Sequence, residues 1–437
     1  MNNTALSLEQ TPPLAVPLIF MLTAPFFPVL ASLVTLLYPE ALGNRWDPAL
    51  IAITHLLTLG FVVMVMVGAL QQFFPVLVGV QLTKPLLFSR VLYFGIASGT
   101  LVLCSGFLMM LPVLIGVGAL LLALSFLWLI TRLLLSLLRS GASTNVTLGM
   151  KLALFSFLVT LLLGLYLAAG YALPQVTLQR SLTSLHLGWG LFGWVGLLIF
   201  TVSYQVVPMF QVTPKYPDQM IRWLAVIMFL NLVLISLVRV TDIIPDHISA
   251  TIVLLLEFVV CSGFTLYALM TLRLQEKRRR KVADVTMDYW RFGLSCLLIA
   301  LVTIALAEGA IVSFRGMDLL IGVLMIIGFT MSLITGMLYK IIPFLVWLHL
   351  TNVIDINTRW QMKIPNMKKI VPDRHARFQF RLHLVAVGLI LSSVFFQEFV
   401  VAAAIAFMLS NLYLAFNLIR GAAVYRRVVS DVSHTTQ

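Results

Sequence analysis

The chain contains the phrase Gln71-Gln72-Phe73-Phe74-Pro75-Val76-Leu77 and repeats it in related form at Tyr204-Gln205-Val206-Val207-Pro208-Met209-Phe210 and at Tyr339-Lys340-Ile341-Ile342-Pro343-Phe344-Leu345. Each copy has a pair of residues drawn from Gln, Tyr and Lys, then two bulky apolar residues, a proline and two more apolar residues. The three prolines lie about 134 residues apart, and each phrase ends a long apolar segment. Self-similarity at a fixed period indicates a repeat architecture.

Composition predicts a membrane protein. Hydrophobic residues make up 61% of the chain and charged residues 10%, and apolar stretches of roughly 20 residues, enough to cross a bilayer, recur along it. We predict an all-α polytopic membrane protein with twelve spans, at about 14–38, 50–80, 87–111, 112–135, 150–173, 182–210, 219–240, 249–272, 289–313, 318–347, 380–396 and 398–420. Only Leu111-Pro112 separates the third span from the fourth. The first span follows a polar start with Glu9 and no basic residue, so we expect no cleaved signal peptide.

The distribution of Lys and Arg predicts the orientation. If the N-terminus is inside, the cytoplasmic connections carry most basic residues, including the run Lys277-Arg278-Arg279-Arg280-Lys281. The opposite connections hold only Arg45, Arg180, Arg239 and Arg315. Because cytoplasmic loops are enriched in basic residues, we expect both termini in the cytoplasm and a multi-pass protein of the bacterial inner membrane. This bias and contact with anionic lipid account for the formal net charge of +13 better than nucleic-acid binding does.

The period of about 134 residues contains four spans, so twelve spans make three repeats. We place them at 14–138, 148–275 and 288–420 within a single membrane domain, 1–437. The second span of each repeat carries the phrase, near its predicted cytoplasmic end. Cys104, Cys261 and Cys296 all fall in apolar helices, where they are most simply small core residues.

The polar residues of the phrases have two interpretations. Neighbouring polar side chains can satisfy the carbonyl that a proline frees within a span. Alternatively, the phrases form a polar layer that lines a water or proton path. The residues of this possible path are Gln72, Tyr204, Gln205, Glu257, Tyr339 and Lys340. Glu257 is the deepest acid, either simply protonated or part of a proton relay, and we expect Lys340 to snorkel inward.

Two histidines are the candidate cofactor ligands. His55 precedes Pro75 by 20 residues and His186 precedes Pro208 by 22. These separations correspond to about 30 Å of helix, a full bilayer, so both histidines should lie near the periplasmic ends of their spans. A neutral imidazole is a common ligand of iron and copper, and two at matching depth on repeat-related helices could face one site. The alternative is that each hydrogen-bonds a neighbour at the water interface.

Twelve spans in three four-helix arcs, with a histidine at the start of spans two and six, resemble the catalytic subunit of the heme–copper oxidase superfamily. The nearest likeness is to its cytochrome c oxidase and nitric oxide reductase branches, and the pattern also resembles NnrS-type membrane proteins, which are linked to nitric oxide responses. The resemblance implies that His55 is a low-spin heme ligand and that His186 is a ligand of copper or non-heme iron.

The departures from that family are equally specific. Oxidases carry a His-His pair in span seven and a His-x-His in span ten, whereas 221–240 and 318–347 contain no histidine here. The usual binuclear centre cannot be built, so the resemblance does not imply a complete oxygen-reducing oxidase. Met325 or Met331 could replace a missing heme ligand, or His55 and His186 could hold a single heme.

Three functions follow as hypotheses. The first is a heme-binding, or copper- or iron-binding, protein that acts in redox, nitric oxide response or respiratory biology. The second is a permease without a cofactor, although the pseudo-threefold repeat differs from the twofold or inverted repeats usual in transporters. The third is an assembly partner of a respiratory complex. The expected partners are lipid, another respiratory subunit or a second copy of the chain.

The predicted topology can be tested with reporters. A fluorescent protein that folds only in the cytoplasm, fused after Gln437, should be bright, and alkaline phosphatase at the same site should be inactive. A fusion in the connection at Arg180 should give the reverse pattern. Active phosphatase after Gln437 would contradict the predicted orientation.

Overall fold

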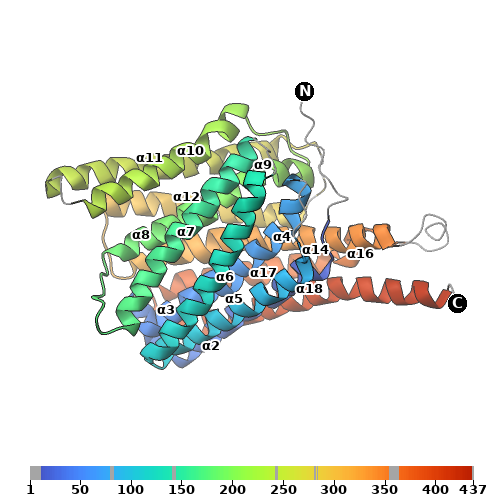
Figure 1. Ribbon diagram of the computed structural model, residues 1–437, viewed down its shortest axis with the longest axis horizontal. Coiled ribbons are helices and arrows are strands. Elements are labelled where there is room, and N and C mark those ends of the chain that lie inside the picture. Colours follow the sequence, from blue (N-terminus) through green and yellow to red (C-terminus); the bar gives the residue numbers. More distant parts are fainter. Residues whose placement is uncertain are drawn as a thin grey trace. The chain divides into compact units, whose positions relative to one another are not determined.

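The computed structural model describes residues 11–78, 83–139, 144–241, 245–279, 282, 284–353 and 364–435, which form helices and no strand (Figure 1). The chain separates into two compact units. We call 1–97, 283–292 and 330–437 the terminal unit, and 98–282 and 293–329 the central unit. Arg280, Lys281 and Lys363, which belong to the basic connections, lie outside the described residues.

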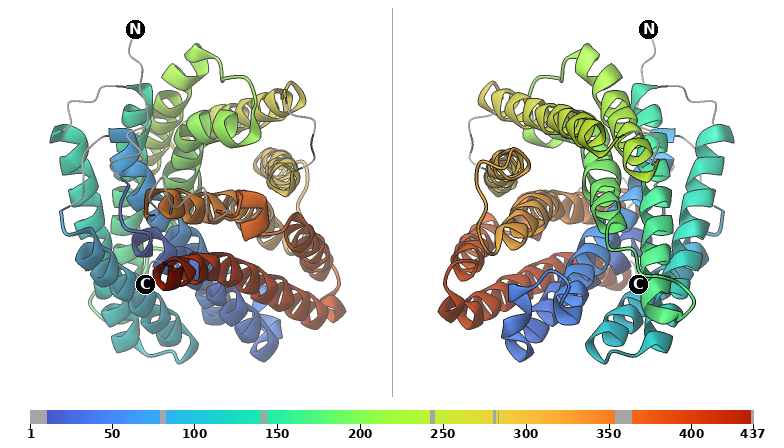
Figure 2. Two further views of the ribbon diagram at one scale, coloured as in Figure 1. Left: turned by 90° about the vertical axis from the view of Figure 1, so that its right-hand side faces the viewer. Right: turned by 90° about the vertical axis from the view of Figure 1, so that its left-hand side faces the viewer.

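The terminal unit combines the two ends of the chain. Its elements are α1 (Ala15–Thr23), α2 (Phe26–Leu37), η2 (Pro39–Gly43), α3 (Pro48–His55), η3 (Leu56–Val63), α4 (Met64–Val78), the first part of α5 (Pro85–Leu108), the start of α12 (Val285–Glu308), α14 (Ser332–Val353), α16 (Met367–Ile370), α17 (Asp373–Ser393), η6 (Gln397–Phe399) and α18 (Val400–Thr435). Helices α17 and α18 pack side by side (Figure 2), and α18 also packs on α2 and α14.

The central unit is a bundle of long helices. It contains the rest of α5, α6 (Pro112–Arg139), α7 (Asn145–Ala172), α8 (Leu182–Gly188), η4 (Trp189–Gly196), α9 (Leu197–Gln211), α10 (Asp218–Val240), α11 (Asp246–Glu276), the rest of α12, α13 (Met317–Gly322) and most of η5 (Val323–Met331). Helix α7 packs on α6, η4 and α9, and α10 packs along α11 (Figure 1).

Within the described residues, eleven helical segments are long and apolar enough to cross a membrane. The polytopic α-helical class is therefore confirmed. The break expected at Leu111-Pro112 is also confirmed, since α5 ends at Leu108 and α6 begins at Pro112. The span predicted at 380–396 corresponds to the apolar end of α17. This helix is not among the eleven, because its first half carries Arg374, Arg377 and Arg381. The twelve-span count stays a prediction.

Prolines occupy two kinds of position in these helices. Among the described helices, four begin with a proline, where the missing N–H costs no hydrogen bond, namely at Pro39, Pro48, Pro85 and Pro112. The prolines of the repeated phrase lie inside helices instead, Pro75 in α4, Pro208 in α9 and Pro343 in α14. The prediction that the phrase ends its span holds closely for α9, which stops at Gln211. It fails for α14, which continues to Val353.

Each span that carries the phrase also contains a π-helical segment, which the sequence analysis did not predict. These segments, η3, η4 and η5, begin at residues 56, 189 and 323, that is, 133 and 134 residues apart. This spacing matches that of the prolines. Such π-helical turns are rare and occur often at functional sites. The residues beside these segments are therefore candidates for functional residues.

Close helix packing depends on aromatic stacking and on glycine. In the central unit, Phe157 of α7 stacks on Trp194 of η4 with ring centroids 4.3 Å apart. Aromatic pairs of this kind contribute about 0.5–1.5 kcal/mol beyond burial. Gly118 of α6 lies so close to α5 that a Cβ atom there would be 2.4 Å from the Leu103 nitrogen. Small residues allow this approach in a membrane, where burial of apolar surface from water does not drive helices together.

Many large apolar side chains point away from the units. Leu120 and Leu124 on α6 are 58% and 60% exposed, and Leu255 and Phe258 on α11 are 62% and 65% exposed. Soluble proteins rarely expose apolar surface on this scale. These helices therefore contact the lipid bilayer.

Gly60 in η3 allows a test of the packing around a π-helical segment. A Cβ atom at Gly60 would lie 2.2 Å from Cδ1 of Phe27 in α2, so Gly60→Ala should destabilise the protein by roughly 1–3 kcal/mol through overpacking. Gly188, which immediately precedes η4, is the matched control, because a Cβ atom there would meet no described neighbour within 4 Å. Thermal unfolding in detergent should show a lower midpoint for Gly60→Ala and an unchanged midpoint for Gly188→Ala. Equal midpoints would contradict this packing.

Candidate functional site

His55 is the last residue of α3 and is half-buried. Its Nδ1 lies 2.8 Å from the carbonyl oxygen of Ile51, one turn earlier. Because a carbonyl oxygen can only accept, Nδ1 carries the proton and donates it. In the neutral ring, the lone pair then lies on Nε2, which is the tautomer that a metal ligand requires.

His186 lies in α8 and is held by a neighbouring helix. Its Nδ1 donates to the carbonyl oxygen of Thr160 in α7 at 3.0 Å. The imidazole ring packs over Gly164 of α7, where a Cβ atom would be 2.9 Å from the ring Cε1. His186 therefore shows the same arrangement as His55, an Nδ1 anchored on backbone and a lone pair on Nε2.

The two histidines border π-helical segments, but not in the same register. His55 immediately precedes η3, whereas His186 lies three residues before η4. Residues two apart on a helix point in nearly opposite directions, so their matching depth does not make their faces equivalent. At the spacing of the π-helical segments, the counterparts of His55 are Gly188 and Gly322. His55 belongs to the terminal unit and His186 to the central unit.

The other membrane-region histidines have different surroundings. His349 uses both ring nitrogens, with Nδ1 2.9 Å from the Leu345 oxygen and Nε2 3.0 Å from the Pro12 oxygen. His383 of α17 is 3% exposed, and its Nε2 lies 2.8 Å from the Ser332 hydroxyl. Among the described residues, no group of three or more His, Cys, Asp and Glu side chains is placed to hold a metal ion.

The polar residues of the phrases have different immediate surroundings. Gln71 and Gln72 are buried in α4, and the Oε1 atom of each lacks a hydrogen-bond partner within the described part of the chain. Gln205 of α9 is half-buried. Lys340 of α14 pairs with Asp284 rather than reaching solvent alone, and their side chains are 25% and 23% exposed.

Tyr204 belongs to a buried tyrosine cluster in the central unit. The ring centroids of Tyr204 and Tyr216 lie 5.0 Å apart, and the Tyr216 ring is parallel to that of Tyr267. The Tyr216 hydroxyl lies 2.9 Å from the Thr271 hydroxyl. One turn further along α11, Gln275 donates to Gln211 at 2.9 Å. Sequence reasoning missed this cluster, although Tyr267, Thr271 and Gln275 recur at four-residue spacing, which places them on one helix face.

Tyr339 belongs to a second polar cluster, in the terminal unit. Asn417 of α18 donates to the Tyr339 hydroxyl at 3.0 Å, and Tyr289 of α12 donates to Gln379 of α17. His375, at the start of α17, hydrogen-bonds Tyr413 of α18 at 2.8 Å. Partial burial and the charges of Arg374 and Arg420 lower the pKa of His375. A polar stripe along α17, at His375, Gln379 and His383, was the available sequence signal for this cluster.

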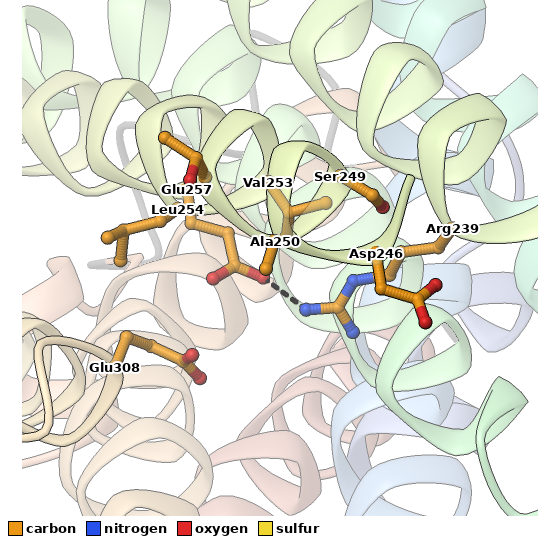
Figure 3. Close-up of a pocket in the computed structure, with 9 residues that line it drawn as sticks. Arg239, Asp246, Ser249, Ala250, Val253, Leu254, Glu257 and Glu308 are labelled. Carbon is orange, nitrogen blue, oxygen red and sulfur yellow. Dashed lines mark hydrogen bonds and ion pairs between the residues drawn. The ribbon is translucent and has the colours of Figure 1, made fainter. Parts of the chain in front are cut away.

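Glu257 forms an ion pair that the sequence analysis did not foresee. Arg239, at the end of α10, donates to Glu257 Oε1 of α11 at 2.7 Å. Neither interpretation of Glu257 from the sequence, as a protonated acid or as part of a proton relay, included this basic partner. The pair lines a cavity of about 450 Å³ that also contains Glu308 and Asp246 (Figure 3).

The residues of the possible polar path are divided between the two units, and the path stays a prediction. Gln72, Lys340 and Tyr339 belong to the terminal unit, and Tyr204, Gln205 and Glu257 to the central unit. Comparison of the sequence with models of known protein families and with curated proteins finds no match.

The glutamine pair allows a test of the tyrosine cluster. Gln275 and Gln211 are 1% and 4% exposed. Gln275→Leu should destabilise the protein by roughly 1–3 kcal/mol, because it leaves the Gln211 carbonyl buried without a donor. The double substitution Gln211→Leu/Gln275→Leu should recover much of that loss, and a double-mutant cycle in chemical denaturation measures the coupling. Additive losses would show that the two amides do not interact.

Proposed function

We propose that this protein binds heme, or a copper or iron ion, through His55 and His186, and acts in redox, nitric oxide response or respiratory biology of a bacterial inner membrane. The observation that carries the proposal is the shared anchoring of the two imidazoles. Each Nδ1 donates to a backbone carbonyl, that of Ile51 or that of Thr160. Histidines that ligate metals nearly always donate their other ring N–H in this way, which fixes the tautomer and orients the ring.

The two backbone carbonyls would orient the imidazole rings of His55 and His186 in different ways. Ile51 belongs to the same helix as His55, so the local backbone alone sets the direction of that ring. Thr160 belongs to α7, so the direction of the His186 ring depends on how α7 and α8 pack. A bound heme would supply one-electron transfer or the binding of a small gas at its iron.

The scaffold is part of the same proposal. The π-helical segments and the proline phrases share a period of about 134 residues, which supports three repeats of four spans. The even number of spans and the basic connections support both termini in the cytoplasm. The likeness to the heme–copper oxidase catalytic subunit extends to this plan and to His55 and His186. It does not extend to a complete oxidase, because the histidines of spans seven and ten are missing from the sequence.

A permease is the second candidate. It is favoured by the polar cavity that contains Arg239, Glu257 and Glu308, which is of a size that fits a small solute. Solute flux in proteoliposomes that survives the loss of both His55 and His186 would favour this candidate over the first.

Absorption spectroscopy and metal analysis of gently purified protein test the first proposal. The wild-type protein should show a Soret band or a stoichiometric metal, and His55→Ala and His186→Ala should each change or abolish it. His349→Ala is the matched control, because both nitrogens of His349 already contact backbone carbonyls, and its spectrum should be unchanged. Folded wild-type protein without heme or metal, or a spectrum indifferent to both substitutions, would refute the proposal.

A further inference from the structure

The cavity beside α10 and α11 has a chemistry that the proposed heme function does not use. Its volume is about 450 Å³, and its lining belongs to the central unit alone. Three carboxylates, Asp246, Glu257 and Glu308, line it together with a single guanidinium, that of Arg239. Acidic side chains thus outnumber basic ones in this lining by three to one, a composition that favours a cationic ligand.

One carboxylate oxygen in this cavity lacks a partner. Arg239 reaches only Oε1 of Glu257, whereas Oε2 is buried and has no hydrogen-bond partner among the described residues. A buried acceptor without a donor is costly. The ligand that would satisfy this oxygen must donate a hydrogen bond as well as carry positive charge.

The second carboxylate faces the same space from another helix. Glu308 is near the C-terminal end of α12, and its carboxylate lies across the cavity from α11 (Figure 3). The lining also includes the apolar side chains of Val253 and Leu254 of α11. A bare metal ion would fill little of the volume and make no use of these apolar side chains, whereas a short hydrocarbon tail would contact them.

We propose that this cavity binds the ammonium group of a primary alkylamine, with its N–H donors on Glu257 Oε2 and the Glu308 carboxylate and its hydrocarbon part on Val253 and Leu254. Arg239 competes with the ligand for Glu257 and keeps this acid paired when the cavity holds no amine. The amine is either a free solute or the ethanolamine headgroup of a lipid. This inference is independent of the histidines.

Binding can be measured on the full-length protein in an uncharged detergent. n-Butylammonium chloride should raise the unfolding temperature saturably, since a ligand that binds only the folded state stabilises it. Tetramethylammonium chloride is the matched probe, with the same charge and no N–H donor, and should act no more than sodium chloride does. Equal shifts with both ammonium salts, or no shift with either, would overturn the proposal.

Substitutions then assign the binding to the cavity. Glu308→Gln should weaken n-butylammonium binding roughly tenfold or more, the loss expected for one charge-assisted hydrogen bond. Glu276→Gln, at the exposed opposite end of α11, should bind as the wild type does. Arg239→Gln should bind more tightly, because a competing cation is removed, and a role for Arg239 limited to joining α10 and α11 would not have this effect. Unchanged binding by both Glu308→Gln and Arg239→Gln would overturn the assignment.

Native mass spectrometry distinguishes the two sources of the ammonium. Phosphatidylethanolamine retained by the wild type, lost from Glu308→Gln and displaced by n-butylammonium identifies a lipid headgroup. Binding of n-butylammonium without retained lipid identifies a free amine. Retention of phosphatidylethanolamine that is insensitive to both Glu308→Gln and n-butylammonium would exclude the lipid headgroup as the ligand of this cavity.

Discussion

Backbone hydrogen bonding in lipid is the constraint on which the rest of this structure depends. Because hydrocarbon offers no partner to an exposed N–H or C=O group, each span must satisfy these groups within its own helix. The chain stays helical even where it departs from the α-helix, as in η3, η4 and η5, and where a proline interrupts the ladder, as at Pro75, Pro208 and Pro343. Small polar side chains also find hydrogen-bond partners within their own helix. The hydroxyls of Thr54 and Thr58 each donate to the backbone carbonyl four residues earlier.

The sequence was sufficient for the elements of the fold that depend on apolar length. A span of about 20 apolar residues, or a proline that begins a helix, can be recognised from the local sequence alone. The break between α5 and α6 at Pro112 was predicted in this way. The long extension of α14 beyond Pro343 could not be read in this way. A proline removes only one donor, and surrounding groups decide whether the helix continues.

The polar groups were harder to predict, because their state depends on partners distant in sequence. Glu257 is 18 residues from Arg239, and Tyr289 is 90 residues from Gln379. His55 and His186 lie near the start of their helical spans, and their depth in the membrane stays a prediction. The direction in which each ring points depends on local winding, and apolar periodicity gives little information about winding in a span that is apolar on all sides.

The π-helical segments have a geometric consequence for everything that follows them. Each residue of an α-helix turns the chain by about 100°, whereas a π-helical turn holds more residues and so turns less at each one. The eight or nine residues of each π-helical segment therefore change the direction in which all later side chains of the span point from the helix axis. Gln71, Tyr204 and Tyr339 follow these segments, so the segments determine the helix face on which each of the three residues lies. If these residues were wound as α-helix with no change of length, the part of the span that follows would rotate and carry its polar residues toward a different neighbour.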